Sequence, residues 1–270
     1  MPTKAATDLR LCRSLLFLPA SNPRAIEKAR TLDADMVILD LEDAVKPADK
    51  DGARTAAVEA ARTPFRGLAA IRINSTSPWH EADLAAVRSS AADYVVVPMT
   101  AGPDEVRAAG EGSGKPVLAM VETARGVLAA PAIAGLAQAL IAGTNDLAAD
   151  LGLRPGRARP ALVTALQSIL LAARAAGIAA FDGVYNRLDD LEGLAVECEM
   201  GRGFGFDGKS LIHPDQIETA NRLFGPTGDE ILAARHLIAA ATDGAERYQG
   251  EMIEAVHVAQ GRFLIAKARA

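Results

Sequence analysis

The chain has 270 residues; half of them are apolar, 4% are aromatic, and the formal net charge is −5. This length fits two small domains or one large α/β barrel, and the apolar content suffices for a sizeable core. The acidic balance and the lack of a dense Lys/Arg run disfavour a nucleic-acid-binding protein, which needs clustered positive charge. The apolar runs are strand-sized, so we expect no membrane span.

The two cysteines, Cys12 and Cys198, have neither metal-finger spacing nor the density of a disulfide framework. The amino-terminal sequence MPTKAATDLRLCRS contains no apolar core of signal-peptide length. We therefore expect a reduced, cytoplasmic protein.

Short apolar runs rich in β-branched residues recur along the chain. Each run is nearly continuous in apolar residues, which is typical of strands buried on both faces, as in a parallel sheet. In chain order the predicted strands are Ser14–Pro19, Met36–Leu41, Ala69–Ile73, Tyr94–Pro98, Pro116–Val121, Leu140–Gly143, Ala179–Val184 and roughly Phe204–Ile212.

Longer Ala-rich amphipathic stretches lie between these runs. The first, Pro23–Leu32, has Asn22 as its expected N-cap and a proline at its first position, where proline is tolerated best. The other predicted helices are Asp49–Arg62, Trp79–Arg88, Asp104–Ala109, Pro160–Ala176, Asp189–Arg202 and Pro214–Leu223.

This alternation predicts an α/β fold, namely a (β/α)₈ TIM barrel that forms a catalytic domain over residues 1–224. A doubly wound open sheet is the alternative, and it is disfavoured because no Gly-x-Gly-x-x-Gly turn follows the first strand. Residues 225–270, with helical stretches at Asp229–Ala241 and about Glu251–Ala268, are predicted as a C-terminal helical extension. Such an extension could pack on the barrel or contact a neighbouring subunit.

Polar residues follow several predicted strands at their carboxyl ends, where parallel barrels place their chemistry. One cationic residue and several carboxylates are thereby predicted to share one rim. The residues are Asp40, Glu42 and Asp43 after strand two, Arg72 and Asn74 after strand three, Glu122 after strand five, and Gly143, Thr144, Asn145 and Asp146 after strand six.

Structural roles are the alternative for most of these residues. Asp43 or Asp146 could cap the next helix, and Arg72 could form a structural ion pair with Glu42. Glu122 is harder to explain in this way, because an unpaired carboxylate directly after an apolar strand is costly.

Glu122 and Asp146 are the predicted metal ligands. Two carboxylates without a nearby His or Cys favour a hard cation, and Mg²⁺ usually takes one or two protein carboxylates and completes its shell with water and substrate oxygens. Zinc is disfavoured because no histidine lies near this cluster in the sequence.

At these residues the sequence resembles the HpcH/HpaI aldolase superfamily and, within it, the citrate lyase β-subunit-like proteins. The resemblance covers most of residues 13–217, and its segments occur in the family's order. They are RSLLFLPASNPRAIEKA (13–29), VILDLEDAV (37–45), IRIN (71–74), AMVETARG (119–126), GTNDLAADLG (143–152) and GFDGKSLIHPDQI (205–217).

This resemblance implies a Mg²⁺-dependent carbon–carbon lyase that cleaves a 3-hydroxyacyl-CoA into acetyl-CoA and a 2-keto acid. It also implies the metal-binding roles of Glu122 and Asp146, substrate binding by Arg72, and an acidic pair at Glu42 and Asp43 beside the metal. Arg13 and Lys28 fall in the segment that resembles the family's coenzyme A-binding edge, so both are candidate substrate-binding residues.

Two features depart from the family's pattern. The chain is short and looks like the stand-alone, homotrimeric members rather than the β-subunits of the citrate lyase complex. Members with a full C-terminal lid carry an aspartate that completes a neighbour's site, whereas the matching segment here, QGEMIEAVH (249–257), has Glu254 in that place. This difference puts the lid residue, and the condensing direction of the reaction, in question.

The sequence leaves the acyl group and the base open. Glu42 or Asp43 could accept the substrate's hydroxyl proton, and citramalyl-CoA, citryl-CoA, malyl-CoA and 3-hydroxy-3-methylglutaryl-CoA differ only in substituents that pocket shape distinguishes. The short form resembles the lyases of itaconate breakdown, which favours citramalyl-CoA. The alternatives are an aldolase that acts on free hydroxy-keto acids without coenzyme A, and a non-catalytic family member.

Overall fold

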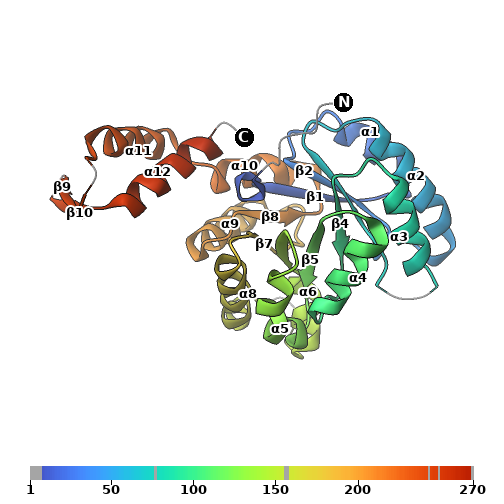
Figure 1. The fold of residues 1–270 in the computed structure, drawn as a ribbon. Coiled ribbons are helices and arrows are strands. Elements are labelled where there is room, and N and C mark those ends of the chain that lie inside the picture. Colours follow the sequence, from blue (N-terminus) through green and yellow to red (C-terminus); the bar gives the residue numbers. More distant parts are fainter. Residues whose placement is uncertain (1–7, 76–77, 155–157, 243, 249, 269–270) are drawn as a thin grey trace.

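The computed structural model describes residues 8–75, 78–154, 158–242, 244–248 and 250–268, so the amino-terminal residues 1–7 lie outside it. Eight parallel strands pair with their sequence neighbours, and β8 pairs with β1 to close the barrel (Figure 1). The closed barrel confirms the predicted (β/α)₈ fold and excludes the open sheet. The strands are β1 (Ser14–Pro19), β2 (Met36–Asp40), β3 (Leu68–Arg72), β4 (Tyr94–Val97), β5 (Val117–Val121), β6 (Ala139–Ala142), β7 (Ala179–Asp182) and β8 (Gly208–Leu211).

Side chains alternate along each strand between the barrel interior and the layer beneath the helices. Leu15, Leu118 and Phe181 belong to the inner apolar cluster, whereas Leu16 and Leu140 belong to the outer one. Because both faces are covered, most strand residues are apolar, with Ser14 and Lys209 among the buried polar exceptions. Asp40 and Arg72 are polar residues that end their strands, and both line the barrel's mouth.

Helices surround the barrel, and the first begins as predicted, with the Asn22 side chain accepting the Ala25 N–H. Two helices were not predicted, α5 and α6, and the predicted helix Pro160–Ala176 is divided in two. The helices are α1 (Pro23–Ala29), α2 (Lys50–Arg62), α3 (His80–Ser89), α4 (Pro103–Ser113), α5 (Ala124–Ala134), α6 (Thr144–Asp150), α7 (Ala158–Ala161), α8 (Val163–Ala175), α9 (Leu191–Phe204) and α10 (Ile217–Phe224).

After the barrel, the chain continues into an arm that extends to one side of it (Figure 1, orange to red). The arm consists of α11 (Gly228–Ala240), a hairpin of β9 (Glu246–Tyr248) and β10 (Glu251–Ile253), and α12 (Ala255–Lys267). The helix predicted from Glu251 is thus wrong in its first residues, which pair with β9 instead. At the end of α12, the Lys267 ammonium donates to the carbonyls of Arg10 and Asp207, which ties the arm back to the barrel.

None of the helices in the described ranges is both long and apolar enough to span a membrane. Cys12 and Cys198 are buried free thiols, and burial raises the pKa of each to about 12, which keeps both protonated at neutral pH.

Candidate active site

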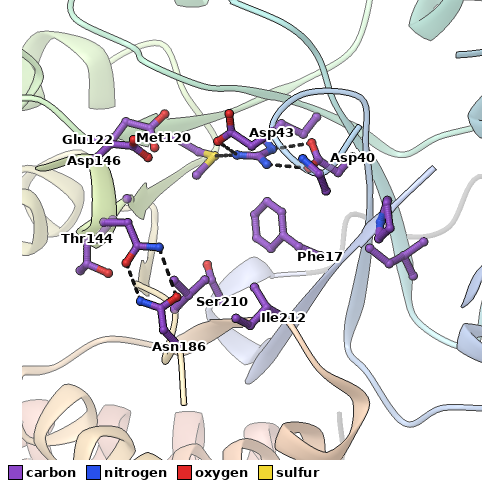
Figure 2. Close-up of a pocket in the computed structure, with 18 residues that line it drawn as sticks. Phe17, Asp40, Asp43, Met120, Glu122, Thr144, Asp146, Asn186, Ser210 and Ile212 are labelled. Carbon is purple, nitrogen blue, oxygen red and sulfur yellow. Dashed lines mark hydrogen bonds and ion pairs between the residues drawn. The ribbon is translucent and has the colours of Figure 1, made fainter. Parts of the chain in front are cut away.

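A cavity of about 360 Å³ opens at the carboxyl ends of the barrel strands (Figure 2). It brings together residues that follow seven of the eight strands, as expected for a barrel with its site at this end. Its lining consists of Phe17, Leu18, Pro19, Asp40, Asp43, Ala44, Arg72, Met120, Glu122, Ala142, Gly143, Thr144, Asn145, Asp146, Val184, Asn186, Ser210 and Ile212.

Arg72 and Asp40 form the buried centre of one wall of this cavity. They are the last residues of β3 and β2 and stand opposite each other in the register of these strands. Arg72 Nε and Nη2 each donate to one Asp40 carboxylate oxygen at 2.6 Å. Asp40 also accepts the backbone N–H groups of Glu42 and Ala44, so its carboxylate fixes both the guanidinium and the following turn.

Glu42 and Asp43 lie at the remaining edge of this guanidinium. Arg72 Nη1 is 2.9 Å from a Glu42 carboxylate oxygen and 3.7 Å from one of Asp43. The ion pair between Arg72 and Glu42, which was the structural alternative, is therefore present. Asp43 lines the cavity and its side chain is 69% exposed, whereas Glu42 is more buried and is not among the lining residues. Burial raises the pKa of Glu42 to about 8; the Arg72 charge opposes this and the nearby carboxylates add to it.

Lys50, which the sequence analysis missed, supports the Glu42 turn from behind. It is buried, and its ammonium donates to the backbone carbonyls of Leu41 and Glu42 and to the Asn74 side chain. Asn74 in turn donates to the fully buried Asp83. A buried hydrogen-bonded network of Lys50, Asn74 and Asp83 thus holds the backbone that carries Glu42.

Glu122 directly follows β5 and is 2% exposed. One of its oxygens accepts the Met99 N–H at 2.5 Å. Met99 has a φ of 52°, a strained conformation for a residue with a side chain. Burial raises the pKa of Glu122 to about 7, against the Met99 hydrogen bond, and the Asp146 charge raises it further. A Cβ on Gly143 would overlap the Glu122 side chain, so a glycine is required there.

Asp146 lies in the first turn of α6 and is exposed. Gly143, not Asp146, occupies the N-cap position of this helix, so the capping alternative does not explain the aspartate. Figure 2 shows the Asp146 and Glu122 carboxylates on the same side of the cavity.

These two carboxylates fit a hard divalent cation. Burial is the main cause of the raised Glu122 pKa, and the Asp146 charge adds to it, so a bound cation would offset both effects. Within the described ranges, no group of three or more His, Cys, Asp or Glu side chains could hold a metal. A site with two protein carboxylates still suits Mg²⁺, which takes its other ligands from water and substrate.

Arg13, Lys28 and Glu254 are not brought to this cavity. Arg13 precedes β1, so it lies at the opposite end of the barrel, where it pairs with Asp35 at 2.9 Å. Lys28 is in the last turn of α1 and exposed. Glu254 begins α12 in the arm, where its side chain takes part in a capping box with His257.

Two further lining residues, Phe17 and Asn186, escaped the sequence analysis. The Phe17 ring packs against the Arg72 guanidinium at 5.3 Å. Asn145 and Asn186 donate to each other's side-chain oxygens at 3.2 and 2.7 Å. The sequence contained only a weak signal for these residues, because an aromatic or amide side chain near a strand end does not indicate a particular ligand or reaction.

Sequence comparisons find relatives over most of the chain. The family model for HpcH/HpaI aldolase/citrate lyase matches residues 13–214. A "(3S)-malyl-CoA thioesterase" from Cereibacter sphaeroides is 42% identical over 96% of this chain and 95% of its own length. The citrate lyase subunit beta of Leuconostoc mesenteroides is 36% identical over 89% of this chain and 86% of its own.

Two solved structures also resemble this chain over most of its length. Protein CitE from Mycobacterium tuberculosis in complex with magnesium, acetoacetate and coenzyme A has a TM-score of 0.83 and 33% identity, covering 97% of this chain and all of that chain. A citrate lyase beta subunit from the same organism, complexed with oxaloacetate and magnesium, has a TM-score of 0.73 and 35% identity, covering 82% and 100%.

Proposed function

The chain belongs to the HpcH/HpaI aldolase/citrate lyase family, and on this premise we propose that it is a Mg²⁺-dependent lyase that cleaves a 3-hydroxyacyl-CoA into acetyl-CoA and a 2-keto acid. One observation carries the proposal. A guanidinium fixed by Asp40 and a pair of carboxylates suited to Mg²⁺, Glu122 and Asp146, line the same cavity. The magnesium and coenzyme A in the solved relative support it.

Glu122 and Asp146 are the residues that would hold Mg²⁺, which supplies Lewis-acid chemistry when it is bound. The chain's own residues account for orientation and proton transfer. Arg72 is the sole cationic side chain that lines the cavity in the part of the chain described here, and it is the donor for the substrate's carboxylate or for the developing enolate oxygen.

The cleavage requires a base for the substrate's hydroxyl. The O–H proton passes to a carboxylate, the adjacent carbon–carbon bond breaks, and its electron pair becomes the enolate of acetyl-CoA, which then takes a proton. Glu42 has a pKa near 8, which is suited to proton transfer near neutral pH. Asp43 is the alternative base because it lines the cavity directly.

Hydrolysis of the thioester is the second candidate activity. The Cereibacter relative, at 42% identity, carries a thioesterase name. A base such as Glu42 could activate water instead of taking a substrate proton, with free coenzyme A and a hydroxy acid as products. The relative's name also supports malyl-CoA, one of the four thioesters considered from the sequence, beside the favoured citramalyl-CoA.

One assay separates these activities. Citramalyl-CoA, citryl-CoA and (3S)-malyl-CoA are incubated with the protein and Mg²⁺, and both keto acid and free thiol are measured. The lyase proposal predicts one keto acid per acetyl-CoA without free thiol. Release of free thiol without keto acid would replace it by the thioesterase. Cleavage of free hydroxy-keto acids without coenzyme A would favour the aldolase, and no turnover of any of these compounds would favour a non-catalytic member.

We also propose that the protein acts in the cytoplasm as a homo-oligomer, with a trimer as the expected form. The arm from α11 to α12 supports this assembly, because it extends to one side of the barrel. Sedimentation of the full chain would test it, since a monomer over the assay's concentration range would contradict it.

A further inference from the structure

We propose that Ser210 contacts the substrate, and that its hydroxyl donates a hydrogen bond to the thioester carbonyl oxygen of the bound acyl-CoA. This inference rests on the proposed function, because it assigns the position of that substrate's thioester group. Ser210 lies on the β8 wall of the cavity, and the proposed mechanism gives no residue of this wall a role.

The Ser210 hydroxyl is buried and has no protein partner. Ser210 is 2% exposed, and its Oγ has no hydrogen-bond partner among the residues that the structure describes. Arg159 and Asn221 also have a buried side-chain atom without a partner, but neither residue lines the active-site cavity. A buried hydroxyl without a partner destabilises the fold, so such a group is expected where a ligand supplies the partner.

Ser210 lies on the opposite side of β7 from Asp146. It belongs to β8, and the neighbouring Leu211 belongs to the outer apolar layer, so Ser210 faces the barrel interior. Figure 2 shows it near Phe17, Asn186 and Ile212, away from the Glu122 and Asp146 carboxylates. A substrate whose hydroxy acid lies at these carboxylates therefore extends its remaining atoms towards the Ser210 wall.

The chemistry of this wall fits a thioester better than a second carboxylate. Its neighbours in the lining include the apolar side chains Phe17, Val184 and Ile212. The amides of Asn145 and Asn186 are hydrogen-bonded to each other. Arg72, the donor proposed for the substrate's carboxylate, ends β3, which does not neighbour the Ser210 strand β8. A carboxylate placed there would lack a cation, whereas a methylene and a neutral carbonyl need only one donor. The Ser210 hydroxyl is that donor.

The test compares Ser210→Ala with Ser113→Ala, a matched control. Ser113 is equally buried, but its hydroxyl bonds the Ala109 carbonyl and the Lys115 N–H in α4, away from the cavity. Thermal unfolding and calorimetric binding of acetyl-CoA, coenzyme A and pyruvate, each with Mg²⁺, are measured for both variants. Coenzyme A lacks the thioester carbonyl, so its comparison with acetyl-CoA isolates that contact.

We expect Ser210→Ala to keep or raise the melting temperature and to weaken acetyl-CoA binding about fivefold, the effect of one neutral hydrogen bond. Binding of coenzyme A and pyruvate should not change. Ser113→Ala should show the reverse pattern, with a lower melting temperature and unchanged binding. Ser210→Cys, which keeps the volume but donates weakly, should resemble Ser210→Ala.

Unchanged acetyl-CoA binding in Ser210→Ala would overturn the inference, because the hydroxyl would then be only hydrated. Weaker pyruvate binding with unchanged acetyl-CoA binding would also overturn it, since Ser210 would then contact the keto acid. If the wild-type protein bound neither acetyl-CoA nor coenzyme A, the proposed function itself would fail and this inference with it.

Discussion

Asp40 and Arg72 end two neighbouring strands and are joined by two 2.6 Å hydrogen bonds beneath the mouth of the barrel. Both are buried, at 1% and 8% exposure. This two-point contact uses the planar shape of the guanidinium and fixes its orientation. Nη1 is left to face Glu42 and Asp43 at the edge of the cavity.

Replacing Arg72 tests whether this orientation matters for turnover. Arg72→Lys keeps the charge but loses the planar fork, so we expect kcat/KM to fall by at least about 100-fold. Arg66→Lys is the control, because the Arg66 side chain is exposed and its ion pair with Asp33 is long, at 3.7 Å. Steady-state kinetics measure both variants, and near-normal rates for Arg72→Lys would make Arg72 a structural residue.

Gly143 tests the position of Glu122. In Gly143→Ala the new methyl group would overlap the Glu122 side chain and displace its carboxylate. We expect Mg²⁺ affinity, measured by calorimetry, to fall at least about tenfold, a typical result of disturbing a metal ligand. Gly203→Ala in α9 is the control because its Cβ would meet open space. Equal Mg²⁺ affinity in the two variants would show that Glu122 is not a ligand.

The raised pKa of Glu122, about 7, predicts a pH dependence of Mg²⁺ binding. A carboxylate ligand must lose its proton before it binds the metal. Below pH 7 the affinity should therefore fall about tenfold per pH unit, and above pH 7 it should level off. Calorimetry between pH 5.5 and 8 in two buffers would also detect the released proton. A constant affinity over this range would contradict the assignment.

The raised pKa values of Glu122 and Glu42 also affect the stability of the metal-free protein. Glu122 and Glu42 have higher pKa values in the folded protein than in the unfolded chain. Between pH 4.5 and 8 the folded state therefore binds more protons, and their contribution to the free energy of unfolding declines as the pH rises. Mg²⁺ should consequently raise the melting temperature more at pH 8 than at pH 5.5, as scanning calorimetry can measure.

Lys50 tests the support of the Glu42 turn. Lys50→Met removes one donor from each of the Leu41 and Glu42 carbonyls, which keep only those of Asn74 and Val45, and it removes the donor to the Asn74 side-chain oxygen. We therefore expect a lower melting temperature and a lower kcat. Mg²⁺ affinity should persist, because Glu122 follows β5 and Asp146 lies in α6, and neither is part of the Lys50 network. Lys46→Met, at an exposed position, is the control. If kcat and melting temperature were both unchanged, the network would have no role in positioning Glu42.

The barrel could be predicted because its strands are buried on both faces and stand out as apolar runs; β1 even has the predicted bounds, Ser14–Pro19. Elements without such a signal were missed. The helix α5 contains Pro131, which reduces its helical pattern, and β9 and β10 have three residues each. Strands this short depend on their pairing rather than on their own sequence.

Part of the site could be predicted because the carboxyl ends of the strands in a parallel barrel meet at one mouth. That rule brings Arg72, Glu122 and Asp146 to one cavity. The same rule explains why Arg13 does not line the cavity. Arg13 precedes β1, so it lies at the amino end of the barrel strands, opposite the cavity. Lys50 and Ser210 were not predicted because their roles depend on which hydrogen-bond partners surround them. Only the folded chain determines those partners.

Removal of the metal shows whether Glu122 and Asp146 hold the Mg²⁺ on which acyl-CoA cleavage depends. Keto-acid release from citramalyl-CoA and (3S)-malyl-CoA is followed in metal-stripped protein before and after Mg²⁺ is added. The wild-type protein should be inactive when stripped and recover fully with Mg²⁺. Glu122→Gln and Asp146→Asn should stay near zero even at excess Mg²⁺. Undiminished wild-type turnover after exhaustive chelation would contradict the claim.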